Sequence, residues 1–326
     1  MHALARHWYR ASPVGVAFAP LGWLYCAVAM LRRALYSVGI LKRVNLPVAV
    51  IVVGNITLGG TGKTPLVIWL AHWLRRHGYR PGIVTRGYGG RARDWPQVVH
   101  AESDPALVGD EPILLARHAA SPVVADPDRV RAARTVIAGG CDVVISDDGL
   151  QHYRLARDVE IAVLDGDRRF GNGRCLPAGP LREPLGRLAA VDARVTNGAA
   201  QAGELAMQLV ETRFRALDSD RDWPVTEFRG RRAHAVAGIG NPQRFFDHLR
   251  RLGVEIIEHA FADHHRFTPA DLAFGDDLPI LMTEKDAVKC AAFADARMAY
   301  LAVEAQPDPR LGELVLGKLK ERCGGG

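Results

Sequence analysis

One segment restricts the fold of this chain more than any other, because a buried strand runs directly into a glycine-rich loop and then a helix. Residues 47–55 form a continuous β-branched apolar run, and GNITLGGTGKTP overlaps its end at 54–65. Such a run is typical of a strand buried on both faces, and the loop has the setting of a P-loop. The first glycine of the usual GxxxxGK[ST] pattern is replaced by Thr57.

A P-loop binds phosphate through backbone N–H groups at a helix N-terminus, with a lysine on the β- and γ-phosphates and a hydroxyl on Mg²⁺. We therefore predict an ATP site. Its predicted binding residues are Gly59, Gly60, Thr61, Gly62, Lys63 and Thr64.

The rest of the chain alternates strand and helix patterns, which predicts an α/β fold with a parallel sheet. In the predicted helix over 63–77, Leu66, Leu70 and Leu74 recur every four residues. Strands are predicted at 82–87, 121–127, 142–149 and 158–166, and a helix at 128–138. In a second alternating stretch, 234–242 is a strand that runs into a glycine-rich turn, 243–253 is a helix candidate, and the further strand candidates are 254–265, 279–286 and 299–305. Residues 198–231 are polar and predict a linker or a small strand pair.

These patterns predict a P-loop NTPase-like core with a second, smaller α/β domain. The predicted divisions are an N-terminal helical segment over 1–45, a P-loop core domain over 46–215 and a C-terminal α/β domain over 216–326.

The N-terminal third is basic, although the whole chain has a formal net charge of only +6. Residues 1–93 contain 13 Lys and Arg and no acid, which indicates an anionic partner. Between Arg10 and Arg32 lie 21 uncharged residues, about the length of a membrane span, interrupted by Pro13 and Pro20. Aromatic residues lie within and beside this stretch and basic residues lie on both sides of it, as is typical of helices anchored at a membrane interface. We predict a membrane-associated helix, either interfacial or shallowly inserted, with a helix packed on the protein's own core as the alternative.

Acidic residues follow a later strand in the pattern of a Walker B motif. The run VVISDDG at 143–149 places Asp147 and Asp148 where a parallel sheet ends beside the P-loop. Carboxylates in that position bind Mg²⁺. Because side chains alternate along a strand, we expect one of the two to bind the metal and the other to orient a ligand.

Three further segments carry candidate catalytic residues. GDEP at 109–112 contains Asp110, and FADHHRF at 261–267 contains His264 and His265. A histidine oriented by a carboxylate can act as a general base for a hydroxyl. In PAGPLREP at 177–184, an arginine could stabilise charge on a phosphoryl group and a glutamate could assist the metal. The histidines lack further ligands at a spacing that would predict zinc.

Taken together and in this order, the motifs resemble those of tetraacyldisaccharide 4′-kinase, the lipid A 4′-kinase of Gram-negative bacteria. The matching segments are VGNITLGGTGKTP, TRGYGG (85–90), GDEP, SDDGLQHYRLARD (146–158), LPAGPLREP (176–184), GIGNP (238–242), FADHH and LMTEKDAVKC (281–290). The uncharged N-terminal stretch resembles the membrane-associating helix of that family.

The resemblance implies transfer of the γ-phosphate of ATP to the 4′-hydroxyl of tetraacyldisaccharide 1-phosphate, at the cytoplasmic face of the inner membrane. It implies that Asp110 and a histidine of FADHH form a carboxylate–histidine pair, with His264 preferred and His265 open. The residues that match the family's Mg-ATP and phosphate motifs are Lys63, Thr64, Asp147, Asp148, Gln151, His152, Arg182 and Glu183. The implied partners are ATP, the acceptor lipid and the membrane surface, and neither the motifs nor the resemblance identifies a protein partner.

Three other functions are less consistent with the sequence. A membrane-associated P-loop ATPase switch would not require both the GDEP acid and the histidines, and the guanine-specific NKxD string is replaced by TEKD at 283–286. A nucleic-acid-binding protein would be expected to show a recognised module or an aromatic-interleaved basic surface. A kinase for a small soluble acceptor would leave the apolar N-terminal stretch as part of the core.

Overall fold

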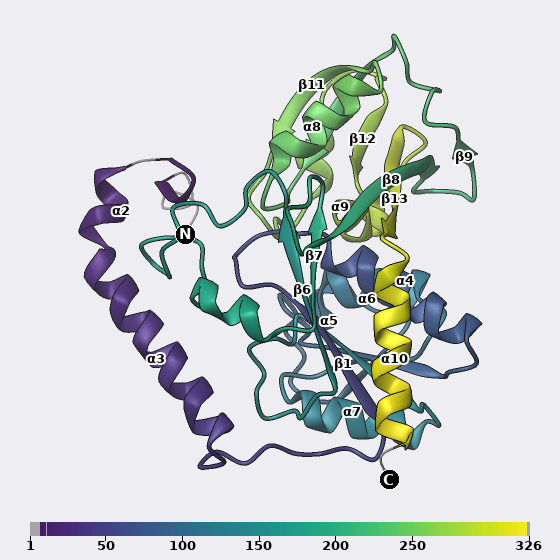
Figure 1. Cartoon of the computed structure of the whole chain (residues 1–326). Helices are drawn as coiled ribbons and strands as arrows, with labels where there is room; N and C mark the ends of the chain where they lie inside the picture. The colour runs from purple at the N-terminus through teal and green to yellow at the C-terminus, as the bar shows by residue number, and fades with distance from the viewer. Residues whose placement is uncertain (1–6, 11, 325–326) are drawn as a thin grey trace.

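A computed structural model describes residues 7–10 and 12–324, and its strands form one large mixed sheet flanked by helices (Figure 1). The strand order is β11-β10-β12-β13-β8-β7-β6-β1-β5-β2-β4-β3, and β9 pairs with β8. In the first lobe the strands are β1 (Ala49–Gly54), β2 (Pro81–Thr85), β3 (Gln97–Val99), β4 (Val123–Ala125), β5 (Val143–Asp147), β6 (Val159–Asp165) and β7 (Ala193–Asn197). The remaining strands form the second lobe and its junction with the first. They are β8 (Leu205–Ala216), β9 (Asp222–Trp223), β10 (Arg232–Ala237), β11 (Glu255–Ala260), β12 (Ile280–Thr283) and β13 (Met298–Pro307).

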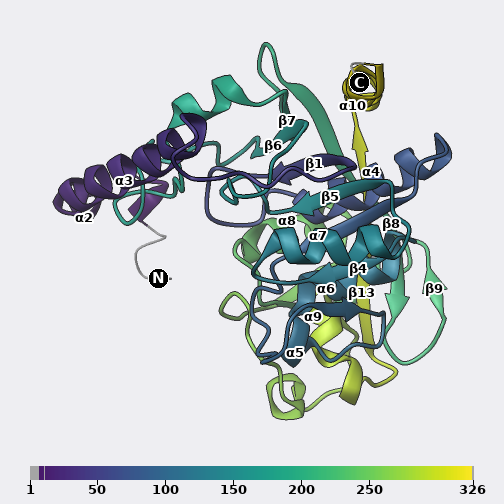
Figure 2. The ribbon, with the colours of Figure 1, turned by 90° about the horizontal axis from the view of Figure 1, so that it is seen from below.

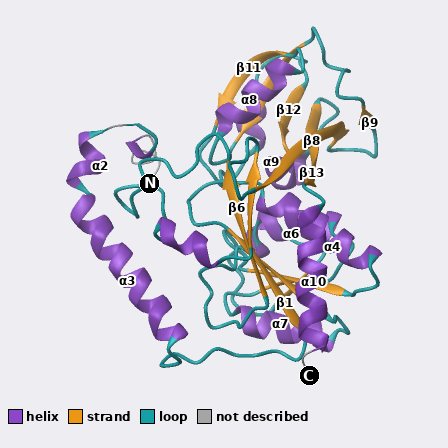
Figure 3. Ribbon diagram, in the orientation of Figure 1, coloured by secondary structure: helices purple, strands orange, loops and turns teal. Residues whose placement is uncertain are grey.

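The helices, purple in Figure 3, precede, separate and follow these strands along the chain. They are α2 (Pro13–Ala17), α3 (Ala19–Ser37), α4 (Lys63–Arg76), α5 (Pro105–Val108), α6 (Asp110–His118), α7 (Arg129–Ala138), α8 (Pro242–Arg251), α9 (Glu284–Cys290) and α10 (Arg310–Gly324). Short 3₁₀ turns are η1 (Leu185–Ala190), η2 (Pro269–Leu272) and η3 (Ala291–Phe293).

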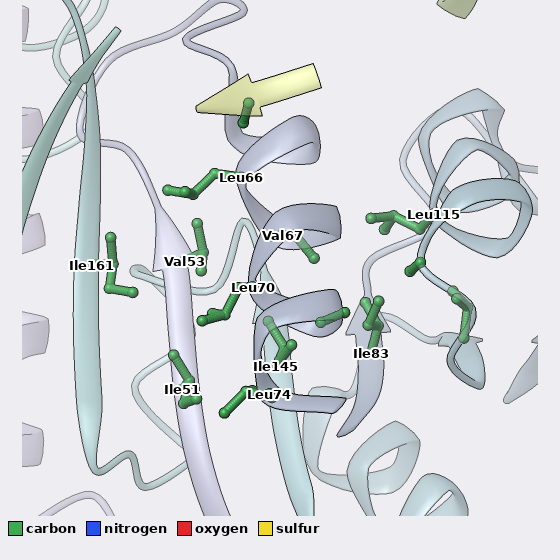
Figure 4. Packing of buried hydrophobic residues seen from close by; sticks show 14 of the residues in the cluster. Ile51, Val53, Leu66, Val67, Leu70, Leu74, Ile83, Leu115, Ile145 and Ile161 are labelled. Atoms are coloured by element: carbon green, nitrogen blue, oxygen red, sulfur yellow. The ribbon is translucent and has the colours of Figure 1, made fainter. Parts of the chain in front are cut away.

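The first lobe is a mostly parallel sheet, with β3 antiparallel to β4 at its edge, and helices cover both faces. Alternate residues of β1 enter different cores: Ile51 and Val53 face α4, whereas Val50 and Val52 face α7. The leucines of α4 that recur every four residues, Leu66, Leu70 and Leu74, are fully buried against β1, β2 and β5 (Figure 4). The four-residue period therefore predicted the buried face of α4 correctly, because residues four apart lie on one side of a helix.

The second lobe repeats this arrangement on a smaller scale. Strands β10, β11 and β12 are parallel, and β12 is also parallel to β13. Helix α8 covers one face through Phe245, Phe246 and Leu249, and α9 covers the other through Ala287 and Cys290. The predicted strand over 279–286 is too long, because β12 ends at Thr283, whose side chain caps α9.

The two lobes are joined by the antiparallel pairing of β8 with β13, which runs from Ala299 opposite Ala216 to Pro307 opposite Met207. The start of β8 pairs with β7 of the first lobe, and the start of β13 pairs with β12 of the second. The predicted strand pair within 198–231 is present as β8 and β9, but the longer partner of β8 is β13.

Helix α10 returns to the first lobe although it follows the whole second lobe in the chain (Figure 1). Its Leu311, Val315 and Leu319 are buried in the same core as α4, and Gly312 lies against Trp73 of that helix. A division of the chain at residue 216 therefore separates α10 from the core on which it packs.

The N-terminal segment forms α2 and α3, and α3 projects from the body of the molecule when seen from below (Figure 2). Ala19 and Gly22 are buried, and Gly22 lies against Ala178 and the carbonyl of Cys175. Among the helices of the described residues, none combines the length and the hydrophobicity that a transmembrane span requires.

The packing of α10 makes a prediction about stability. Leu311→Ala should lower the free energy of unfolding by about 2–5 kcal/mol, because truncation of a buried leucine leaves a cavity. Urea unfolding followed by circular dichroism measures the change. Leu107→Ala is the matched control, because the Leu107 side chain is 48% exposed on α5. Equal stability of the two variants would show that α10 does not contribute to the first core.

Candidate active site

A large cleft, with a volume of about 2040 Å³, lies between the two lobes. The loop over 58–64 and the start of α4 line it from the first lobe. Residues of β8 and β13, the loop at Gly240, His264 and the start of α9 line it from the second lobe and the junction. The parallel strands of the first lobe end at this cleft, which is where α/β sheets usually place their ligand sites.

The glycine-rich loop has the shape of a phosphate cradle. Gly59 and Gly62 adopt φ values of 108° and 94°, which a side chain would disfavour. Asn55 donates from Nδ2 to the Gly59 carbonyl at 3.3 Å, and Asn197 donates from Nδ2 to the Thr61 carbonyl at 3.3 Å. No side chain caps the N-terminus of α4, so the N–H groups of its first turn are free to bind an anion.

Two cations meet one carboxylate beside this loop. Lys63 Nζ lies 3.6 Å from Asp148 Oδ1, and Arg182 donates from Nη1 to both Asp148 oxygens at 3.0 and 2.8 Å. Burial by itself raises the pKa of Asp148, but the charges of Lys63 and Arg182 outweigh it and keep that pKa well below its usual range. Asp148 is therefore ionised, and its two partners form a cationic surface at the P-loop.

The neighbouring Asp147 has the opposite environment. Its carboxyl group is buried, Thr85 donates to Oδ2 at 3.4 Å, and Oδ1 has no hydrogen-bond partner. Burial, followed by the negative charges of Glu111 and Asp148, raises the pKa of Asp147 to about 7. A buried acceptor without a partner next to a phosphate cradle fits a magnesium ion, which uses one or two carboxylates together with phosphate and water.

Of the other residues predicted to bind the metal or the nucleotide, some line the cleft and some lie behind its wall. Thr64 and Gln151 line the cleft. Gln151 donates from Nε2 to Glu183 at 2.9 Å and to the Asn55 carbonyl at 3.1 Å, and Tyr153 also donates to Glu183. Glu183 is only 3% exposed, so its contacts place it behind the cleft wall.

His152 is not among the residues that line the cleft in the described part of the chain. Burial, followed by the charge of Arg129, lowers the pKa of His152 to about 4, so its ring is neutral at physiological pH. In the same part of the chain, no three His, Cys, Asp or Glu side chains are grouped closely enough to bind a metal by themselves.

The carboxylate–histidine pair spans the cleft between the lobes. Asp110, the first residue of α6, places Oδ2 3.4 Å from Nδ1 of His264. Burial raises the pKa of Asp110, but the nearby His264 ring and the charge of Lys285 outweigh this and lower it overall. His264 adopts φ of 59°, and its ring meets Tyr88 edge-on with centroids 5.0 Å apart. His265 instead faces Asp271 at 3.3 Å, so the structure places His264 next to Asp110.

Several cationic residues of the cleft were not predicted from the sequence, and two of them, Lys285 and Arg168, contact residues of the opposite lobe. Lys285, in the TEKD string, lies 3.0 Å from Glu111 and 3.4 Å from His264 Nε2. Arg168 follows β6 and donates from Nη1 to the carbonyl of Gly240 at 3.3 Å. A side chain at Gly240 would lie 3.6 Å from the Cα of Gly59, so the loop of the second lobe rests on the P-loop. The sequence signal that could have identified Lys285 is its position in LMTEKDAVKC, one of the segments that match the family.

Comparison with known proteins gives a consistent result. Residues 14–320 match the model of the family described as tetraacyldisaccharide-1-P 4′-kinase, LpxK. A protein of Alkalilimnicola ehrlichii named tetraacyldisaccharide 4′-kinase is 55% identical over 96% of this chain and 96% of its own length. A protein of the same name from Nitrosococcus oceani is 51% identical over 98% of this chain and 94% of its own length. The crystal structure of LpxK from Aquifex aeolicus in complex with ATP has a TM-score of 0.77 at 30% identity, covering 94% of this chain and 99% of that one.

Proposed function

Because this chain belongs to the LpxK family of tetraacyldisaccharide-1-P 4′-kinases, we propose that its cleft transfers the γ-phosphate of ATP to the 4′-hydroxyl of tetraacyldisaccharide 1-phosphate. The observation that carries the proposal is the shared cleft: the P-loop with Lys63 lines one side, and His264, paired with Asp110, lines the other. A phosphate cradle and a hydroxyl base on facing walls are what transfer to an alcohol requires.

On the nucleotide side, the N–H groups from Gly59 to Thr64 bind the phosphates and Lys63 neutralises the β- and γ-phosphates. In the structure Lys63 contacts Asp148 at 3.6 Å, and a triphosphate would compete for that ammonium. Arg182 lies on the same carboxylate at 2.8 Å and is placed to stabilise charge on the transferred group.

The residues at the cradle also fit magnesium. Asp147, whose buried Oδ1 has no partner, and the hydroxyl of Thr64 are the groups that would bind it; Thr64 and Asp148 line the cleft, and Asp147 lies behind them. Magnesium would supply charge neutralisation on the phosphate oxygens. Gln151 and Glu183, hydrogen-bonded to each other at 2.9 Å, would support this wall of the cleft.

On the acceptor side, His264 takes the proton of the 4′-hydroxyl. Its Nδ1 faces Asp110, so Nε2 is the nitrogen that accepts. The hydroxyl oxygen forms a bond to the γ-phosphorus while the bond from that phosphorus to the β–γ bridging oxygen breaks, and ADP leaves. Asp110 stabilises the imidazolium that forms, because it is an ionised carboxylate next to the ring.

We further propose that α3 lies on the cytoplasmic face of the inner membrane. Its surface carries Leu21, Trp23, Leu24, Val28, Met30 and Leu31, each at least 50% exposed, and these side chains face away from the core. Arg32, Lys42 and Arg43 are exposed and follow them in the chain. An apolar helix face flanked by cations fits an interfacial helix on an anionic bilayer, where the acceptor lipid also resides.

A transfer assay tests the reaction. With γ-labelled ATP, Mg²⁺ and detergent-dispersed tetraacyldisaccharide 1-phosphate, the native chain should label the lipid. Lys63→Ala should lose on the order of 10²–10³-fold in turnover, as expected for removal of one group that stabilises transferred charge. Lys318→Ala, on α10 outside the cleft, is the control. Release of label only as inorganic phosphate, unaffected by the lipid, would contradict the proposal and favour an ATPase switch.

The base assignment predicts a difference between two adjacent histidines. His264→Ala should lower kcat by about 10²–10⁴-fold with little change in KM for ATP, because general base catalysis contributes that much. Asp110→Ala should also lower kcat more than it raises KM. His265→Ala is the matched control and should retain turnover, since His265 faces Asp271. The assignment is wrong if the His265 variant loses as much as the His264 variant.

The membrane assignment predicts that charges on α3 weaken vesicle binding. The double variant Leu24→Glu/Leu31→Glu should bind anionic phospholipid vesicles at least ~10-fold less tightly, since burial of one leucine contributes about 1.5–3 kcal/mol. Co-sedimentation with vesicles measures this. Val98→Glu/Leu107→Glu, at side chains 52% and 48% exposed elsewhere, is the control. Equal binding of both double variants would exclude α3 as the membrane contact.

A further inference from the structure

Lys285 lies where the two lobes meet, at the start of α9. Its Nζ is 3.0 Å from Glu111 Oε1, 3.4 Å from His264 Nε2 and 3.9 Å from both Asp110 Oδ2 and Asp263 Oδ1. Glu111 and Asp110 belong to α6 of the first lobe, whereas the other three residues belong to the second. The lysine is therefore the one cation in direct contact with both members of the base pair among the described residues.

The nearest neighbours of the His264 ring favour one of its two neutral tautomers. An ammonium has three donors and no acceptor, and an ionised carboxylate has only acceptors. Asp110 faces Nδ1 at 3.4 Å, whereas Nε2 faces Lys285 at 3.4 Å and, further away, Asp263 at 3.8 Å. The closer contacts favour the hydrogen on Nδ1 and the lone pair on Nε2. That is the form in which Nε2 can accept a proton from a hydroxyl.

We propose that Lys285 is a positioning residue for phosphoryl transfer, which fixes the tautomer of His264 and joins the base to the first lobe through Glu111. This inference rests on the proposed function, because it assigns Lys285 a role through His264. Lys285 acts on the ring and forms no bond to the transferred group.

Lys285 partly offsets the negative charge around the ring. Asp110, Glu111 and Asp263 are three carboxylates around one imidazole, with the phenol of Tyr88 at the ring edge and Lys289 further along α9. Burial lowers the pKa of Lys285, but Glu111, Asp110 and Asp263 outweigh it and raise that pKa above the ordinary value. The ammonium therefore stays charged across the working pH range and keeps its contacts with these carboxylates.

The shortest contact of the lysine explains how the base becomes available. Nζ lies closer to Glu111, at 3.0 Å, than to His264, at 3.4 Å. An approaching hydroxyl can replace the ammonium as the donor to Nε2 while Lys285 keeps its ion pair with Glu111. The lysine thus fixes the ring before the acceptor arrives and remains bound to α6 afterwards.

Steady-state kinetics across pH test this role. Lys285→Met should lower kcat at neutral pH at least ~10-fold, a part of the 10²–10⁴-fold range of general base catalysis, with KM for ATP within about 2-fold. The acid limb of the kcat profile should move to higher pH, because the ring loses a cation that opposes its protonation and keeps three carboxylates. Lys285→Arg retains the charge and should restore part of kcat and return the acid limb toward its native position.

Two further variants complete the experiment. Lys318→Met removes the same charge from α10, where its partner is Asp192, and should leave both kcat and the pH profile unchanged. In a His264→Ala background, Lys285→Met should change kcat by less than about 2-fold, because a residue that acts through the ring has no effect without it.

Three outcomes would overturn the inference. They are a native pH profile in Lys285→Met, a large rise in KM for ATP with kcat intact, and a full additional loss of kcat in the His264→Ala background. Each is measured in preparations in which the native chain labels the lipid. Absence of labelling by the native chain would instead refute the proposed function, so the two failures are distinguishable.

Discussion

The pairing of β8 with β13 is the constraint on which the cleft depends. Met207 to Ala216 of β8 faces Ala299 to Pro307 of β13, and this ribbon is the sheet connection between the lobes in the described part of the chain. Only its ends have further partners, β7 on one side and β12 and β9 on the other. A two-stranded ribbon twists more freely than the interior of a sheet, and the pairing is irregular between Ala302 and Val303. The ribbon therefore sets how the lobes face each other across the cleft, and α9 of the second lobe adds to this junction through Val288, which is buried in the same core as α4.

Burial decides how the acidic residues of the site differ in chemistry. Asp147 and Asp148 are adjacent, yet the pKa of Asp147 is raised to about 7 by burial, whereas Lys63 and Arg182 lower that of Asp148. The backbone explains the difference: Asp147 ends the buried β5, and Asp148 follows it with φ of 48°, which turns its side chain to the cations. The end of β5 thus provides two different groups. Asp147 has an oxygen without a hydrogen-bond partner, which can bind a cation, and Asp148 is an ionised carboxylate that orients Lys63 and Arg182.

The sequence predicted what depends on local periodicity and missed what depends on distant contacts. The apolar run of β1, the leucines of α4 and the glycine loop are local patterns, so the parallel core and the phosphate site could be predicted. The partner of β8 lies some ninety residues further along the chain, and Lys285 meets Glu111 across 174 residues. No pattern in one sequence specifies such pairs. Residue type also could not separate His264 from His265, because the choice depends on the backbone turn at His264.

The base pair is itself divided between the lobes, and this has a consequence for specificity. Asp110 belongs to α6, and His264 with Lys285 belongs to the second lobe, so the pair exists only when the lobes meet. If the ribbon opens, His264 loses its carboxylate, Lys285 loses Glu111, and the phosphates at the P-loop have no base nearby. A water molecule that reaches the open cradle is then not activated for attack on ATP. We infer that the division of the base, together with exclusion of water on closure, favours transfer to the sugar hydroxyl over hydrolysis.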